Sequence, residues 1–158
     1  MTGDCTILPL TAELTAQHLK ALLAIDGETI GERWQSSHLM SPMPGKWELS
    51  RLALRPDGPP AGFLIASQKQ ESVHVHRLAV AGDLRGRGIG EILTLATAQS
   101  AVRMSLTTMT LKVARKNTGA IRFYQRLGFR EDGRTHDNLV MAIALAELIK
   151  HSGSAVER

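Results

Sequence analysis

Two stretches of the chain alternate apolar and polar residues, as a β-strand with one buried face does. Residues 73–80 and 106–114 have this pattern, and the second stretch is rich in β-branched residues. In the first stretch, the alternation predicts one face formed by Val73, Val75 and Ala79. The opposite face is predicted to carry His74, His76, Leu78 and Val80.

Between these two stretches, apolar residues recur at helical spacing from Ile89 to Met104. The segment therefore predicts a strand, a helix and a second strand in immediate succession. Parallel strands need a crossover connection, usually a helix, so we expect these two strands to be parallel. The pattern indicates an α/β protein built around this unit.

The remaining pattern predicts short elements on both sides of that unit. Strands are expected at residues 5–10, 47–55, 62–68, 129–134 and 139–145, and the second and third of these form a hairpin around a Pro/Gly-rich turn. Helices are expected at residues 11–26, 28–36 and 119–127. We expect one domain over residues 1–150, a chain that frays from Ala146 onward, and a flexible tail at 151–158.

Composition narrows the class of protein. Hydrophobic residues make up 43% of the 158 residues, and no apolar run approaches the roughly 18 that a membrane span needs. The first residues lack the basic and apolar segments of a secretory signal, which favours the cytoplasm. Cys5 is the only cysteine, so no internal disulfide is expected.

The net charge of +4 raises the question of nucleic acid. A nucleic-acid binder usually presents a continuous basic face with stacking aromatic residues, but aromatic residues are only 4% of this chain. A phosphorylated ligand explains the charge with fewer assumptions.

A basic, glycine-rich turn precedes the predicted helix at Ile89. Glycines let the backbone approach a phosphate closely, and the first N–H groups of a helix have no partner within it. The turn is formed by Leu84, Arg85, Gly86, Arg87, Gly88, Ile89 and Gly90. We therefore expect the segment from Arg85 to Gly90 to bind a pyrophosphate.

Two common nucleotide motifs do not fit this turn. A dinucleotide fingerprint that starts at Gly86 would need a glycine at position 91, which is Glu91. The acidic residue expected about 20 residues later is also missing. A P-loop needs Gly-Lys-Ser/Thr before the helix, and this sequence is absent.

The pattern that does fit is Arg-x-x-Gly-x-Gly, formed by Arg85, Gly88 and Gly90. A second block, Asn117 to Phe129, has the form Asn-x-x-Ala-x-x-x-Tyr-x-x-x-Gly-Phe. Together, in this order, the two blocks resemble the GNAT superfamily of acetyl-CoA-dependent N-acetyltransferases. The resemblance implies a mixed central sheet of about six to seven strands, flanked by about four helices, with a splayed parallel pair forming an acetyl-CoA cleft.

The resemblance also implies roles for individual residues. The backbone of Leu78, Ala79 and Val80 would pair with the pantetheine arm, and one of its N–H groups would polarise the thioester oxygen. Tyr124 matches the family tyrosine that protonates the departing CoA thiolate. Asn117 either bonds the cofactor arm or caps the helix, and the sequence leaves these alternatives open.

The general base is less clearly marked. Many family members carry a glutamate on the strand before the turn, but the position two before Leu78 is His76. Its imidazole titrates near neutrality and could serve directly or through a water. For His76 a catalytic and a purely structural role are equally compatible with the sequence, whereas for His74 the structural role is favoured. The His-x-His pair has no evident third metal ligand, so no metal is predicted.

The acceptor is an amine that the sequence does not identify. The resemblance places substrate selection in the 26–47 segment and the 133–138 loop. Candidates are Glu28, Glu32, Trp34, His38, Trp47, His136 and Asp137. Glu28 and Glu32 would share a helix face and attract a cation, although a solvated acidic face is an equal alternative.

The expected reaction transfers the acetyl group of acetyl-CoA to a primary amine by direct attack in a ternary complex. The alternative is a catalytically silent CoA-binding regulatory module, which the missing glutamate motivates. The partners expected are a small-molecule or peptide amine, with no nucleic acid and no membrane, and a homodimer is compatible with this interpretation.

Overall fold

The computed structural model describes residues 5–29 and 32–156, and these form a seven-stranded mixed sheet in the order β1-β2-β3-β4-β5-β7-β6. The strands are β1 (Thr6–Pro9), β2 (Arg51–Leu54), β3 (Pro60–Lys69), β4 (Ser72–Val80), β5 (Thr108–Ala114), β6 (Arg130–Arg134) and β7 (Asn138–Ala144). Only β4 and β5 are parallel, and the other neighbours are antiparallel. The predicted strand–helix–strand unit is therefore confirmed.

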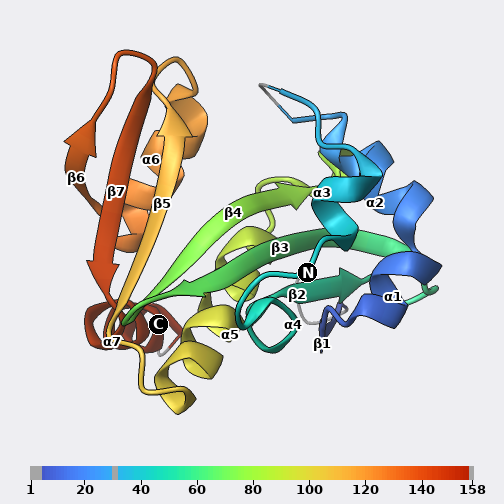
Figure 1. The fold of residues 1–158 in the computed structure, drawn as a ribbon, viewed down its shortest axis with the longest axis horizontal. Coiled ribbons are helices and arrows are strands. Elements are labelled where there is room, and N and C mark those ends of the chain that lie inside the picture. Colours follow the sequence, from blue (N-terminus) through green and yellow to red (C-terminus); the bar gives the residue numbers. More distant parts are fainter. Residues whose placement is uncertain (1–4, 30–31, 157–158) are drawn as a thin grey trace.

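Helices cover both faces of the sheet (Figure 1). They are α1 (Ala12–Gln17), α2 (Leu19–Asp26), α3 (Ser36–Met40), α4 (Lys46–Leu49), α5 (Ile89–Arg103), α6 (Thr118–Leu127) and α7 (Leu145–Val156). A short 3₁₀ turn, η2 (Gly82–Leu84), connects β4 to the glycine-rich segment. Within the described residues, no helix combines the length and the apolar character that crossing a membrane requires.

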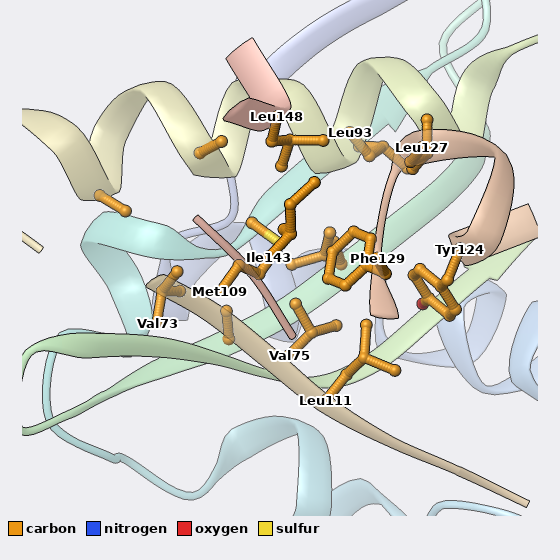
Figure 2. Close-up of a cluster of buried hydrophobic side chains, with 14 of the residues drawn as sticks. Val73, Val75, Leu93, Met109, Leu111, Tyr124, Leu127, Phe129, Ile143 and Leu148 are labelled. Carbon is orange, nitrogen blue, oxygen red and sulfur yellow. The ribbon is translucent and has the colours of Figure 1, made fainter. Parts of the chain in front are cut away.

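Two separate hydrophobic cores result, one on each face. The first, the α5–α7 core, joins the sheet to α5, α6 and α7. Figure 2 labels ten of its members: Val73, Val75, Leu93, Met109, Leu111, Tyr124, Leu127, Phe129, Ile143 and Leu148. The second, the α1–α3 core, packs the opposite face against α2 and α3 through residues that include Leu22, Ile25, Leu39, Phe63, Ile65 and Ala79. A sheet buried on both faces holds its strands rigidly, which suits it to position a site.

The parallel pair separates partway along its length. β4 and β5 pair only from Ser72↔Thr108 to Val75↔Leu111. Beyond that point β5 stays paired with β7, as far as Ala114↔Asn138, and β4 stays paired with β3, as far as Gly62↔Val80. The two strands therefore diverge, as Figure 1 shows, and the second half of β4 has one edge without a strand partner.

A β-bulge on β4 corrects the predicted arrangement of its side chains. Ala66 pairs with Val75 and Ile65 pairs with Arg77, so His76 is an extra residue on this strand. The extra residue reverses the alternation: Val73 and Val75 lie in the α5–α7 core, but Ala79 lies in the α1–α3 core. The prediction that these three side chains share a face was wrong, because it assumed an uninterrupted strand.

Other predictions needed correction too. The helix expected at 28–36 is absent from the described part of that range; residues 30 and 31 lie outside it, and α3 begins only at Ser36. The strand expected at 47–55 begins instead as helix α4, after Gly45 in the left-handed conformation. The segment expected to fray from Ala146 forms α7, anchored by Leu145 and Leu148, each 1% exposed. Residues 157 and 158 of the predicted tail lie outside the described range.

The described helices number seven, more than the four expected, while the strand number and the splayed parallel pair agree with the predicted fold. The extra helices are mostly short: α1, α3 and α4 each span six residues or fewer. Such short helices carry too little periodic pattern to be separated from turns in a sequence.

Candidate active site

The glycine-rich turn leaves the N-terminus of α5 open. Gly86 and Gly88 have φ angles of 78° and 85°, a conformation that side chains other than glycine rarely adopt. Gly88 is the N-cap of α5 and supplies no side-chain hydrogen bond to it. The first N–H groups of α5 therefore remain available to an anion, and the helix dipole favours negative charge there.

A cavity of about 510 Å³ extends from this turn to the splayed half of β4. It is lined by Thr29, Leu78, Ala79, Val80, Leu84, Arg85, Gly86, Gly88, Ile89, Gly90, Glu91, Asn117, Gly119, Ala120, Phe123, Tyr124, Arg126 and Leu127. All the residues predicted to hold the cofactor line it, with the exception of Arg87. Arg87 instead lines a separate cavity of about 200 Å³, beside Cys5 and Arg55.

Arg85 is already hydrogen-bonded to the protein. Its Nε donates to the carbonyl of Val80 at 3.2 Å, and its Nη2 donates to the carbonyl of Glu28 at 2.8 Å. The Glu28 carboxylate in turn accepts from the N–H of Gly82 at 2.7 Å. The two bonds of Glu28 therefore fasten the segment after α2 to the connection between β4 and α5.

A second cavity, of about 260 Å³, lies beside the first. It is lined by Thr29, Glu32, Val75, His76, Arg77, Leu78, Leu111, Lys112, Val113, Ala114, Asn117, Ala120, Tyr124 and Asn138. Five residues line both cavities: Thr29, Leu78, Asn117, Ala120 and Tyr124. The two spaces therefore meet where β4 and β5 diverge.

Tyr124 stands at this junction on helix α6. Its side chain is 8% exposed, and its ring makes edge contacts with Phe123 and Phe129 at centroid distances of 5.0 and 5.2 Å. Figure 2 shows Tyr124 and Phe129 side by side at one end of the α5–α7 core. Burial raises the pKa of the Tyr124 hydroxyl, so this group stays protonated at neutral pH.

Helix α6 is held in place by the motif residues themselves. Asn117 caps it, because its Oδ1 accepts from the N–H of Ala120 at 3.2 Å. Gly128 ends it in the left-handed conformation, with φ of 104°. Asn117 thus performs the capping role and also lines both cavities.

The two histidines of β4 lie on one face, with ring centroids 4.9 Å apart. Nε2 of His76 lies 2.7 Å from the hydroxyl of Ser67, and Nδ1 of His74 lies 2.8 Å from the hydroxyl of Thr110. Burial, aided by the charge of Lys69, lowers the pKa of His74 to about 4. Burial also lowers the pKa of His76, so both rings are neutral at pH 7.

Of the predicted acceptor residues, only Glu32 lines the second cavity. Glu28 is bonded to Gly82, Trp34 donates its backbone N–H to Asp26, and His38 accepts from the N–H of Gln35 as part of a helix cap. The predicted shared helix face of Glu28 and Glu32 was wrong, because neither residue lies in a helix: Glu28 is in a turn and Glu32 in a bend. Trp47, His136 and Asp137 line neither the larger nor the second cavity.

Sequence reasoning missed the most elaborate polar contact of this region. Arg77 lines the second cavity and forms an ion pair with Asp26, with 2.5 Å between Nε and Oδ1. Its Nη2 also donates to the hydroxyl of Thr29 and to the carbonyl of Glu32. Asp26, 1% exposed, accepts in addition from the N–H of Trp34. An unexpected charge in an apolar helix, Asp26 in Leu-Leu-Ala-Ile-Asp, was the available signal.

No metal site is found among the described side chains, where no group of three or more His, Cys, Asp or Glu residues could hold an ion. The polar groups that line the junction are the side chains of Tyr124, His76, Arg77, Glu32 and Lys112, together with backbone amides.

A cleft between splayed parallel strands, closed at one end by a glycine-rich turn, is the arrangement of an acyl-CoA-binding transferase fold. A family model described as the acetyltransferase (GNAT) family matches residues 19–129. The chain belongs to this family.

Two curated relatives match parts of the chain. An uncharacterized N-acetyltransferase from Methanocaldococcus jannaschii is 37% identical over 82 residues, which are 48% of this chain and 36% of that protein. A peptidyl-lysine N-acetyltransferase from Salmonella typhimurium is 33% identical over 94 residues, which are 57% of each chain. The chain thus spans less than two thirds of the length of either relative.

The fold also has solved counterparts. The PaiA N-acetyltransferase from Thermoplasma acidophilum, crystallised in complex with coenzyme A, superimposes with a TM-score of 0.74 at 16% sequence identity. The match covers 89% of this chain and 98% of that one. It establishes the shared fold.

Proposed function

We propose that the protein is an N-acetyltransferase that transfers the acetyl group of acetyl-CoA to a primary amine by direct attack in a ternary complex. The observation that carries the proposal is the meeting of two cavities at Leu78, Asn117 and Tyr124. One cavity has the features of a CoA site, and the other gives a second molecule access to the same point. The names of both curated relatives support N-acetyl transfer.

The residues of the larger cavity fit the chemical groups of CoA. The uncapped amides at the start of α5 suit the pyrophosphate, with Gly86 and Gly88 providing the close backbone approach. The unpaired edge of β4 at Leu78 to Val80 suits the amide-containing pantetheine arm. Acetyl-CoA, when bound, supplies the activated thioester.

Backbone amides at the end of β4 would stabilise the negative charge that develops on the thioester oxygen. Such preorganised donors favour the transition state over the ground state. Because β4 is bonded to β3 along its other edge, these donors hold their direction without reorganising during the reaction.

Tyr124 would donate to the departing thiolate. A phenol with a pKa near 10 is a weaker acid than a thiol with a pKa near 8.5, so in water the transfer is uphill by roughly 2 kcal/mol. Burial destabilises the thiolate as well as the phenolate, so desolvation in a shared cleft does not by itself enlarge this gap. The protonated hydroxyl of Tyr124 is thus suited to bond, and finally protonate, the leaving sulfur.

His76 would take the proton of the amine. An ammonium group with a pKa near 10.4 is about 0.04% neutral at pH 7, which adds about 4–5 kcal/mol to the barrier. A neutral imidazole on the wall of the second cavity can remove that proton, directly or through a water. Lys112 on the same wall favours the neutral amine over the ammonium form.

The acceptor remains a broad class, either a small-molecule amine or an amine of a peptide. The Salmonella relative acts on peptidyl-lysine according to its name, which supports including lysine peptides. Glu32 is the acidic side chain of the second cavity and the candidate to attract an amine.

The test is an acceptor screen read by thiol release from acetyl-CoA. The panel contains polyamines, amino acids, aminoglycosides, lysine peptides and peptides with free amino termini. Turnover on at least one class, lost on substitution of Tyr124 by Phe, supports the proposal. Acetyl-CoA binding without turnover across the panel would instead favour the silent CoA-binding module.

A further inference from the structure

We propose that Ser67 is a positioning residue for His76: it holds the imidazole by Nε2, so that Nδ1 is the nitrogen that meets the amine. The proposal rests on the proposed function, in which His76 is the base. Ser67 lies on β3, outside both family motifs.

Ser67 and His76 are near neighbours across β3 and β4. Ser67 stands directly opposite His74 in the β3–β4 register, and His76 is the extra residue that follows. His74 and His76 lie on one face, as alternate residues of a strand do, and the ring of His76 reaches the hydroxyl of Ser67. The distance of 2.7 Å between Ser67 Oγ and His76 Nε2 is that of a short hydrogen bond.

The two ring nitrogens of His76 have different surroundings. His76 lines the second cavity, whereas Ser67 lines neither that cavity nor the larger one and is 2% exposed. The Nε2 end of the ring is therefore directed into the sheet. Nδ1 is the nitrogen left for the amine.

The proton balance then fixes the tautomer. If Nδ1 is to take a proton from the amine, the neutral ring must carry its own proton on Nε2 and donate it to Ser67 Oγ. After transfer, the amine nitrogen has lost one proton, Nδ1 has gained it, and Nε2 still donates to Ser67. A hydroxyl can accept this bond in both states of the ring, so Ser67 keeps the ring oriented throughout.

The charged groups around His76 do not replace this contact. Lys69 at the end of β3 and Lys46 of α4 lie near enough to disfavour the imidazolium, and the His74 ring meets the His76 ring edge-on. Arg77, the next residue of β4, is committed to Asp26. Among the described residues, Ser67 is the hydrogen-bond partner of the His76 ring.

The neighbouring histidine provides a matched control. His74 Nδ1 and Thr110 Oγ1 form an equivalent bond of 2.8 Å, and neither residue lines either cavity. Ser67→Ala removes the hydroxyl that contacts His76, and Thr110→Val removes the hydroxyl that contacts His74 on the same face. In the proposed mechanism, His74 takes no part in the reaction.

The experiment compares Ser67→Ala, Ser67→Thr and Thr110→Val in steady-state kinetics, each checked by its melting temperature. Ser67→Ala is expected to lower kcat about tenfold, the equivalent of one hydrogen bond, and to leave the KM for acetyl-CoA unchanged. It should also move the ascending limb of the pH–rate profile to lower pH, because the imidazolium loses an acceptor. Ser67→Thr should have the kcat and the pH–rate profile of the wild type. Thr110→Val should also leave kcat and the pH–rate profile unchanged.

A nitrogen-15 NMR measurement of the histidine side chains gives a readout that does not depend on turnover. The expected result is a proton on Nε2 of His76 in the wild type, with a change of its chemical shift in Ser67→Ala. A proton on Nδ1, or a kcat and pH profile unaffected by Ser67→Ala, would overturn the proposal. If no amine is acetylated at all, the proposed function fails, whereas the tautomer still decides whether Ser67 orients the ring.

Discussion

The two halves of β4 differ in how many strand partners they have. From Ser72 to Val75 the strand is paired on both edges, with β3 and with β5. From Arg77 to Val80 it is paired only with β3, and its other edge lines the larger cavity. The bulge residue His76 lies between the two halves.

The difference shows how one strand serves two purposes. The first half stabilises the sheet, and its valines belong to the α5–α7 core. The second half gives up one set of strand hydrogen bonds and gains an edge that can receive a ligand. The contacts that hold this half in place, with β3 and through the Arg77–Asp26 pair, should therefore be costly to lose.

The largest effect is expected at the junction of the cavities. Tyr124→Phe should lower kcat by about 10³-fold, within the range for a general acid, because the thiolate loses its donor. The Tyr124 hydroxyl has no hydrogen-bond partner among the described residues, so stability and the KM for acetyl-CoA should hardly change. Unaltered turnover would remove Tyr124 from the mechanism.

The second-largest effect is expected for the ion pair between Arg77 and Asp26, which holds the splayed half of β4. Arg77→Met leaves the Asp26 carboxylate, 1% exposed, without its cation, and is expected to lower the free energy of unfolding by about 3 kcal/mol in urea titrations. Arg55→Met is the control, because its partner Asp83 is 64% exposed and the pair is solvated. An equal loss of unfolding free energy in both variants would contradict the claim that the burial of Asp26 makes its ion pair important for stability.

A smaller loss is expected where β3 supports the splayed half. A methyl group at Gly62 would lie 2.8 Å from the carbonyl oxygen of Ala79, which is backbone of β4. Gly62→Ala should cost about 2 kcal/mol, since the strand must shift, and should raise the KM for acetyl-CoA. Gly133→Ala on the edge strand β6 is the control, because its nearest neighbour would be 3.8 Å away. Full stability of Gly62→Ala would contradict the close approach.

The smallest expected effect is a loss of stability at low pH caused by His74, in the half of β4 that is paired on both edges. The pKa of His74 is about 4 in the folded protein and near 6.5 when the chain is unfolded, so the unfolded state binds more protons below pH 6.5. The stability from this ring is complete above pH 6.5 and is lost as the pH falls toward 4. For a half-buried ring we expect about 1 kcal/mol between pH 7 and pH 5.

His74→Gln should reduce that pH dependence of the unfolding free energy, measured by denaturant titration at both values. Because all other titrating groups are retained, the difference between the variant and the wild type isolates His74. An identical pH dependence in the two proteins would show that the ring is not desolvated.

The parts of the molecule that the sequence predicts are those whose structure is determined by residues close together in the chain. The strand–helix–strand unit follows from alternation at Val73–Val80 and a helical stripe from Ile89, and the cap at Asn117 and the left-handed Gly128 follow from residue chemistry. These patterns depend on residues within a few positions of one another. The family resemblance rests on the same stretch, which explains why the cleft was the better-predicted region.

The features that the sequence did not predict depend on contacts between residues that are far apart in the chain. The bulge at His76 is set by the register of Ile65 and Ala66 on β3, and no feature of residues 72–80 reveals it. The ion pair between Arg77 and Asp26 joins residues 51 positions apart. The acceptor side was therefore predicted poorly, because its geometry depends on how separate segments meet.

The most direct test of the central claim is amide hydrogen exchange along β4 with and without acetyl-CoA. We expect the N–H groups of residues 77–80 that point away from β3 to exchange more slowly when acetyl-CoA is added, because the pantetheine arm then occupies the free edge. The amides of residues 72–75, already paired on both edges, should be unchanged. Exchange at residues 77–80 that acetyl-CoA does not slow would contradict the assignment of the splayed half as the cofactor-binding edge.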